Sequence, residues 1–184
     1  MKKCIIVHGW GGSPTTNWIP AMKKAVEAKG YEVEVPEMPD TENPVISAWL
    51  KKLQEVAVDP DSETVFIGHS IGCQAILRFL EKLTSGTKIN RCIFFAPWIT
   101  LKGLETDDER EIAKPWLETP IDFEKVKSHC DVFTAFFSDD DPFVPVEDKK
   151  VFEEKLHAET HLEHKKGHFD NLDVQNYPLV VKIK

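Results

Sequence analysis

Residues 64–72 read TVFIGHSIG, an apolar run that leads into a serine placed between two glycines. The run Thr64–Ile67 is rich in β-branched and aromatic residues, as buried strands are. The residues that follow, Ile71–Leu83, place apolar side chains along one face of a helix. A turn between strand and helix can be this tight only where the serine's neighbours carry almost no side chain. The stretch therefore predicts a strand, a sharp turn at Ser70 and a helix.

Short runs of the same kind recur on both sides of this stretch. Several are apolar on both faces, as parallel strands covered by helices must be. Two that nearly alternate, Glu32–Val35 and Glu159–Glu163, fit best at the edges of a sheet. The other expected strands are Cys4–His8, Cys92–Ala96 and Val132–Phe137.

Segments with helical spacing separate the expected strands. Besides residues 71–83 they are Asn17–Lys29, Pro44–Val56, Val146–Leu156 and Tyr177–Ile183. Alternating strands and helices predict an α/β fold, a parallel sheet with helices on both faces in a three-layer sandwich. The length suits a single domain over residues 1–184. Ligands of such sheets bind at the carboxyl ends of the strands, so residues that do chemistry should follow strands directly.

The charge of the chain argues against a nucleic-acid partner. There are 31 acidic and 23 basic residues, a net charge of −8, and no basic stripe that could displace counterions from phosphates. The acidic residues are expected in solvated loops, as in Thr106–Glu111.

The N-terminus and the cysteines favour a cytoplasmic protein. Two lysines precede the apolar run at residues 4–7, but a His-Gly pair ends that run far short of a signal core or a membrane span. The four cysteines form no CxxC pair, so reduced thiols are expected.

The segment Gly68–Gly72 matches the G-x-S-x-G nucleophile elbow, in the strand-turn-helix context that this motif requires. A serine hydroxyl needs a base to take its proton, and in this fold the partners follow in the order Ser, Asp or Glu, then His. Residues 138–145, SDDDPFVP, come directly after an expected strand. Of its three aspartates Asp141 is the expected partner, because the D-x-x-V-P spacing lets the chain drop into the next helix. Asp139 and Asp140 are then expected to be solvated loop residues.

A histidine follows the last expected strand. His168 comes after Gly167, which permits a sharp turn, and we expect it to take the Ser70 proton while Asp141 holds its other nitrogen. His157, His161 and His164 are close in sequence, but no HExxH or cysteine pattern joins them. They are expected at the surface, and neither a metal nor an organic cofactor is expected.

Residues 8–12, HGWGG, follow the first expected strand and form a glycine-rich loop of the kind that approaches a substrate oxygen closely. The backbone N–H groups of Trp10 and Ile71 are the expected oxyanion hole. The loop lacks the residues of a P-loop or a dinucleotide fingerprint. His8 and His69 are expected to position or pack, not to act as bases.

These motifs resemble the small serine hydrolases related to retinoblastoma-binding protein nine. The resemblance covers nearly the whole chain and rests on HGWGG, GHSIG, residues 116–126, DDDPFVP and the GHF at 167–169. It implies a reduced α/β-hydrolase fold with six parallel strands, helices on both sides and no lid domain. The family's triad falls on Ser70, Asp141 and His168. Members are implied to hydrolyse small esters, amides or aminoacyl compounds. The L-x-C-x-E motif that gave the family its name is absent from this sequence.

The sequence thus predicts a serine hydrolase of carboxylesterase or aminoacyl hydrolase type that acts on a small molecule. Aromatic residues on loops around the site suggest the lining of an acyl pocket: Trp10, Trp98, Trp116, Phe143 and Phe169. A core position is an equally good interpretation for Trp98 and Trp116. The alternative function is a catalytically silent protein-interaction module that keeps the fold, because a fold alone does not imply turnover.

Overall fold

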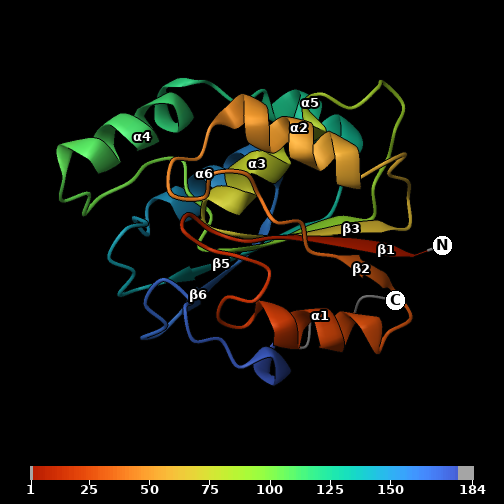
Figure 1. Ribbon diagram of the computed structural model, residues 1–184, viewed down its shortest axis with the longest axis horizontal. Helices are drawn as coiled ribbons and strands as arrows, with labels where there is room; N and C mark the ends of the chain where they lie inside the picture. The colour runs from red at the N-terminus through yellow and green to blue at the C-terminus, as the bar shows by residue number, and fades with distance from the viewer. Residues whose placement is uncertain (1, 178–184) are drawn as a thin grey trace.

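The computed structural model describes residues 2–177, which form one parallel sheet of six strands flanked by helices (Figure 1). The strand order is β2-β1-β3-β4-β5-β6, so the chain starts near one edge, passes through the centre and ends at the other edge. The strands are β1 (Lys3–Val7), β2 (Glu32–Glu34), β3 (Thr64–His69), β4 (Arg91–Phe95), β5 (Phe133–Ser138) and β6 (Glu159–Glu163).

The inner strands and the edge strands differ in how far their residues are buried. Every residue of β3 and β5 is buried, because helices cover both faces of the sheet there. The alternating sequences predicted edge strands, and β2 and β6 do lie at the two edges and keep exposed side chains. Each strand differs from its predicted range by no more than two residues at either end, and β6 matches it.

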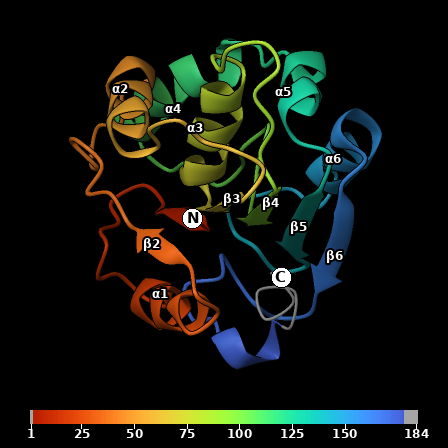
Figure 2. The same ribbon diagram turned by 90° about the vertical axis from the view of Figure 1, so that its right-hand side faces the viewer.

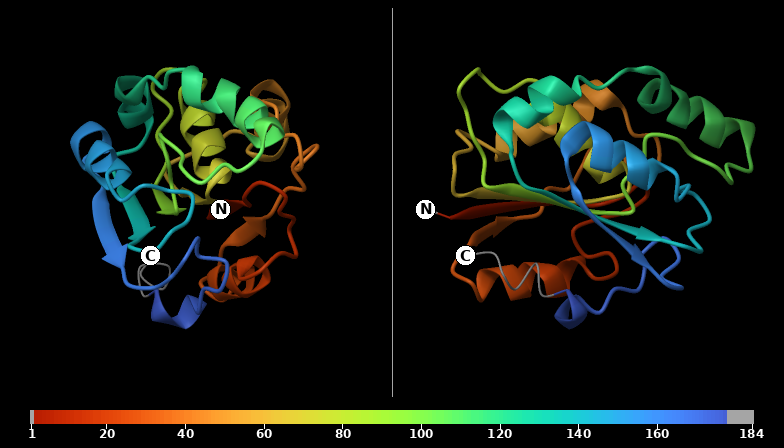
Figure 3. Two further views of the ribbon diagram at one scale, coloured as in Figure 1. Left: turned by 90° about the vertical axis from the view of Figure 1, so that its left-hand side faces the viewer. Right: turned by 180° about the vertical axis from the view of Figure 1, so that it is seen from behind.

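The helices form two unequal layers, seen from the two sides in Figures 2 and 3. One face carries α1 (Ile19–Glu27) and the short 3₁₀ helix η1 (Val174–Asn176), which touch each other. The other face carries a row in which each helix packs on the next: α2 (Ile46–Val56), α3 (Ile71–Leu80), α5 (Phe123–His129) and α6 (Asp148–Leu156). The predicted three-layer fold is confirmed. The predicted helix at 177–183 lies outside the described residues, except for Tyr177.

Two α-helices were not predicted, α5 and α4 (Asp107–Glu118). Thr106, expected in a solvated acidic loop, is the N-cap of α4. Its side chain accepts from the N–H of Glu109, while the Glu109 carboxylate accepts from the N–H of Thr106. This is a capping box, and the acidic first turn also complements the helix dipole. The loop prediction was wrong because the charges were interpreted only as solvated surface.

All four cysteines, Cys4, Cys73, Cys92 and Cys130, are free and fully buried. They lie in or next to β1, α3, β4 and α5, so the thiols are spread through the core. Among residues 2–177 no helix is long and apolar enough to cross a membrane.

Candidate active site

A cavity of about 590 Å³ opens at the carboxyl ends of the strands, the end over which α4 projects in Figure 1. Its lining comes from segments far apart in the chain, including the residues after β1, the turn after β3 and the loops after β4, β5 and β6. Ser70 and His168 both border it. Parallel topology explains this convergence, because the carboxyl ends of parallel strands all meet at one edge.

Ser70 occupies a strained turn between β3 and α3. Its φ is 51° and its ψ −121°, a conformation that costs a residue with a side chain on the order of 1–3 kcal/mol. The N–H of Ser70 donates to the carbonyl of Phe95 at 2.9 Å, which ties the turn to the end of β4. Ser70 is also the N-cap of α3, so the positive end of that helix lies beneath its hydroxyl.

The two glycines of the turn are required by close approach. A Cβ on Gly72 would lie 2.4 Å from the carbonyl oxygen of Val7 and 2.7 Å from that of His8. A Cβ on Gly68 would lie 2.9 Å from Ile76 Cδ1 and 3.0 Å from the backbone of Cys73. Helix α3 therefore packs closely on β1 at Gly72 and on β3 at Gly68 only because these two positions carry no side chain.

Asp141 and His168 form a hydrogen-bonded pair. Nδ1 of His168 donates to the Asp141 carboxylate, at 2.9 Å from Oδ2 and 3.1 Å from Oδ1. Oδ1 also accepts the N–H groups of Phe143 and Val144 at 2.8 and 3.0 Å. The Asp141 side chain is 1% exposed, so the carboxylate is fixed and shielded from water. With Nδ1 engaged, Nε2 is the ring nitrogen that can serve Ser70.

The other two aspartates of the loop are exposed as expected, but they are not merely solvated. Asp140 accepts the Ser138 hydroxyl and the N–H of Gly167, at 2.7 and 2.8 Å. Asp139 accepts the N–H of Lys165 at 2.9 Å and contacts Nδ1 of His164 at 2.5 Å. The backbone and histidine hydrogen bonds keep the pKa of Asp139 below its usual range. Both side chains thus hold the segment that ends in His168.

The glycine loop after β1 lies beside the start of α3, because a Cβ on Gly9 would lie 3.5 Å from Cβ of Ser70. The N–H groups of Gly11 and Gly12 donate to Thr41 and Gly9 carbonyls, at 2.8 and 3.1 Å. Within residues 2–177 the N–H groups of Trp10 and Ile71 donate to no backbone carbonyl, and both residues line the cavity. These are the two donors expected from the sequence.

The predicted aromatic pocket is only partly formed. Trp10, Trp98 and Phe143 line the cavity. The rings of Phe143 and His168 pack edge-on, with their centroids 5.2 Å apart. Trp116 and Phe169 do not line it, so their assignment to the pocket was wrong. Trp116 is buried under α2 against Trp49, and Phe169 turns inward against Phe95. Both rings therefore belong to the core.

One wall of the cavity was missed by the sequence reasoning. The segment between β4 and α5 contributes apolar side chains from Leu101, Leu104 and, on α4, Ile112. The segment is fixed at both ends. Asp148, buried, accepts the N–H groups of residues 99 and 100, and Arg78 donates to the carbonyls of Trp116 and Thr119. The capping box at Thr106 was the sequence signal that could have located it.

His69, next to the serine, is buried and hydrogen-bonded. Its Nε2–H donates to the backbone carbonyl of His168 at 2.8 Å, and its ring meets Trp18 edge-on. Burial, followed by the charge of nearby His168, lowers the pKa of His69 from 6.5 to about 4. It is therefore neutral at pH 7, and it positions the segment that carries His168.

This lowered pKa predicts acid sensitivity. Between pH 6.5 and about 4 the unfolded chain binds a proton at residue 69 that the folded chain excludes, so stability falls as pH drops through that window. The full effect is on the order of 3 kcal/mol. We expect His69→Gln, which keeps a donor for the His168 carbonyl, to flatten this dependence in urea unfolding at pH 4.5 and 7.5. Equal pH dependence in both proteins would contradict the assignment.

Among residues 2–177 no group of three or more His, Cys, Asp or Glu side chains is arranged to hold a metal. His161 stacks on Phe136 at the sheet edge and His164 contacts Asp139, so these histidines have other contacts.

Comparisons with known proteins show the family of this chain. The model of the serine hydrolase family matches residues 4–181. The chain is 29% identical to serine hydrolase RBBP9 of Rattus norvegicus over 183 residues, which cover 98% of this chain and 94% of the relative. It is 28% identical to YdeN of Bacillus subtilis over 169 residues, 91% of this chain and 86% of YdeN.

Solved structures share the same architecture. The crystal structure of the ydeN gene product from B. subtilis matches with a TM-score of 0.87 and 25% identity, covering 100% of this chain and 98% of that one. Est1E from Butyrivibrio proteoclasticus matches with a TM-score of 0.73 and 16% identity, over 98% and 84% of the two chains. The second likeness shows the fold alone.

Proposed function

Since this chain belongs to the serine hydrolase family, we propose that it cleaves small ester, amide or aminoacyl substrates through an acyl-enzyme on Ser70. The observation that carries the proposal is the buried Asp141–His168 pair at the cavity that the strained Ser70 also borders. A scaffold or binding module has no need for a strained serine and an oriented imidazole in one cavity.

The proposed reaction proceeds in two steps. Ser70 Oγ attacks the substrate carbonyl carbon while His168 Nε2 takes the hydroxyl proton, and Asp141 stabilises the imidazolium that results. The carbonyl oxygen becomes an oxyanion, and the N–H groups of Trp10 and Ile71 would donate to it. The carbon–leaving-group bond then breaks, and His168 returns the proton to the leaving group. Water repeats the sequence on the acyl-enzyme and frees the acid and Ser70.

A fluorophosphonate, which reacts with activated serines, tests this proposal. Modification of the wild-type protein by one equivalent, mapped to Ser70 by peptide mass analysis, would support it. A folded protein that stays unmodified and hydrolyses no member of an ester, aminoacyl-amide and lactone panel would instead favour the binding-module alternative.

We also propose a cytoplasmic location for this protein. The four free, buried thiols fit this proposal.

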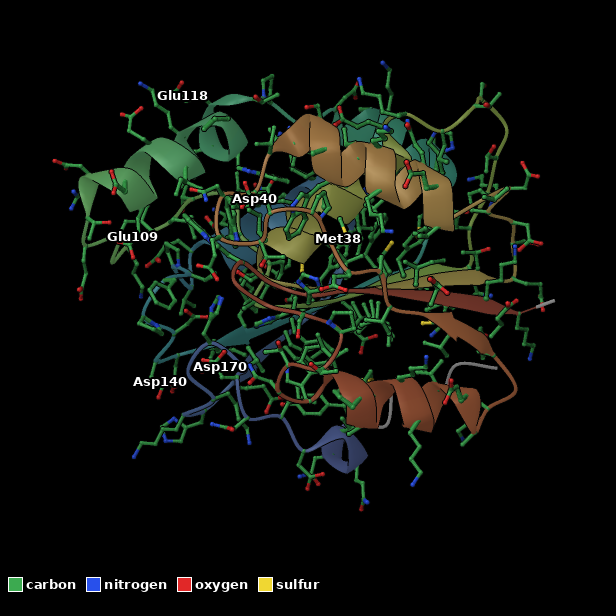
Figure 4. All side chains as sticks on the ribbon, viewed as in Figure 1. Met38, Asp40, Glu109, Glu118, Asp140 and Asp170 are labelled. Atoms are coloured by element: carbon green, nitrogen blue, oxygen red, sulfur yellow. The ribbon has the colours of Figure 1, made fainter. Side chains whose placement is uncertain are left out.

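The charge of the cavity lining predicts substrate preference. Four carboxylate residues line the cavity: Glu42, Asp108, Glu109 and Asp170. Among residues 2–177 no Lys or Arg lines it. Figure 4 shows Glu109 and Asp170 at the same end of the molecule. One sign of charge around a cleft repels ligands of that sign and attracts those of the opposite sign.

We therefore expect esters that differ only in a terminal group to rank ammonium, then hydroxyl, then carboxylate in kcat/KM. A spread of at least about tenfold between the ends of the series is expected at low salt, shrinking at about 1 M salt, where the Debye length is about 3 Å. A carboxylate ester that is hydrolysed as fast as its ammonium counterpart would contradict the prediction. Glu154→Gln, on the exposed face of α6, removes one negative charge outside the cavity lining. This control variant should show the same ranking of the three esters as the wild-type protein.

A further inference from the structure

We propose that His8 is a positioning residue that presets the oxyanion hole by fixing the peptide plane between Gly9 and Trp10. The inference rests on the proposed function, because it concerns the donor that Trp10 would offer to a reacting carbonyl. His8 follows β1 at the start of the glycine loop and is fully buried.

Both ring nitrogens of His8 contact backbone groups. Nδ1 lies 2.9 Å from the carbonyl oxygen of Gly9, and Nε2 lies 3.3 Å from the backbone nitrogen of Met38. The Met38 N–H can only donate, so Nε2 must accept and the ring proton must be on Nδ1. The tautomer is therefore set by the connection after β2, which carries Met38 (labelled in Figure 4). Burial also lowers the pKa of His8, which keeps the ring neutral.

The Gly9 carbonyl accepts two hydrogen bonds. Besides Nδ1–H of His8, it accepts the N–H of Gly12 at 3.1 Å. A Cβ on Gly12 would lie 3.0 Å from that same oxygen and 3.2 Å from Nδ1 of His8, so the cluster is closely packed. The edge of the His8 ring is held in turn by Trp49, with ring centroids 5.8 Å apart. The carbonyl is thus fixed from two directions.

Fixing this carbonyl fixes the N–H of Trp10. The two groups belong to one planar trans peptide unit, in which the C=O and the N–H point in opposite directions, and the described chain has no cis peptide bond. With the carbonyl turned toward His8 and Gly12, the Trp10 N–H must point away from them. That N–H donates to no backbone carbonyl, and Trp10 lines the cavity with Ser70. The donor is therefore oriented before substrate arrives, which is what makes an oxyanion hole effective.

Two amide substitutions separate the two nitrogens of the ring. In His8→Asn the side-chain amide nitrogen can take the place of Nδ1 and still donate to the Gly9 carbonyl. In His8→Gln the amide reaches the place of Nε2, where it can meet Met38, and the donor to Gly9 is lost. We expect His8→Gln to lower kcat by about 10- to 100-fold with KM changed less than about twofold. His8→Asn should retain kcat within about threefold of wild type, although both variants lose the ring contact with Trp49.

Crystal structures of the two variants test the positioning independently of turnover. The Gly9–Trp10 peptide should keep its orientation in His8→Asn and be rotated or present in two orientations in His8→Gln. Equal losses of kcat in both variants, or an unchanged peptide in His8→Gln, would overturn the proposal. If the wild-type protein hydrolyses nothing and resists fluorophosphonate, the proposed function fails, whereas the two structures still decide whether His8 fixes the peptide.

Discussion

Ser70→Ala is expected to abolish fluorophosphonate modification and to lower kcat for ester hydrolysis by about 10⁶-fold. The substitution removes one oxygen from a turn that glycines and the Phe95 carbonyl hold in place, so the fold should persist. Alanine also tolerates the φ of 51° no worse than serine does. Rates measured with a chromogenic ester, together with a thermal unfolding curve, separate the loss of the nucleophile from any loss of structure.

The partners of Ser70 should show a characteristic pattern of losses. His168→Ala removes the base and should cost about as much as Ser70→Ala, and the double variant should be no slower than either single one. Asp141→Asn keeps the size of the side chain but favours the wrong tautomer of His168, and a loss of about 10⁴-fold is expected. Additive losses in the double variant would mean that the two groups act separately, against the proposed mechanism.

Asp131→Asn is the matched control for Asp141→Asn. Asp131 precedes β5 and Asp141 follows it, so the same chemical change is made at opposite ends of one strand. Its carboxylate is 76% exposed and pairs with Lys88, a type of contact worth about 0–1 kcal/mol. Activity close to wild type is expected for this variant. A comparable loss at both positions would show that activity depends on the overall charge of the protein and not on the Asp141–His168 pair.

Gly72→Ala is expected to destabilise the protein by more than about 3 kcal/mol, a large part of the 5–15 kcal/mol that holds a typical domain folded. The added methyl group would lie 2.4 Å from the carbonyl oxygen of Val7, a backbone atom at the end of strand β1. It cannot be accommodated by a side-chain rotation, so α3 must move away from the sheet. The urea midpoint and the yield of folded protein measure the effect.

Gly86→Ala provides the control for this substitution. No atom lies within 4 Å of a Cβ built at Gly86, and the residue has a φ of 90°, so only backbone strain opposes alanine there. A loss of about 1 kcal/mol is expected. If Gly72→Ala were no more destabilising than Gly86→Ala, the close packing of β1 on α3 would not be what requires glycine in the turn.

The sequence predicted the strands and the central residues of the site because the signals for them lie close together in the sequence and follow a fixed order along the chain. Ser70, Asp141 and His168 each follow a strand, and parallel topology brings all such positions to one edge. The signals for β3 and the turn lay within nine residues. The same local reasoning predicted that His8 and His69 position or pack, and their hydrogen bonds to backbone carbonyls fit the first of these roles.

What the sequence did not predict depends on contacts between distant segments. Whether Trp116 faces the cavity or the core is decided by how α4 lies on α2, and no pattern near Trp116 reports it. Phe169 has a φ of 58°, and this backbone conformation accompanies a ring packed on Phe95 instead of toward substrate. The acidic segment at 106–111 is different, since its capping box was visible and was not used.

The four buried cysteines can be used to measure how often the folded protein opens. A thiol reagent needs a thiolate that it can touch, and burial both covers these sulfurs and raises the pKa of the Cys4 and Cys73 thiols. Modification must therefore wait for the chain to open, and its rate counts opening events without any engineered label. The order in which the four cysteines react would rank β1, α3, β4 and the end of α5 by how readily each of these elements opens and exposes its cysteine.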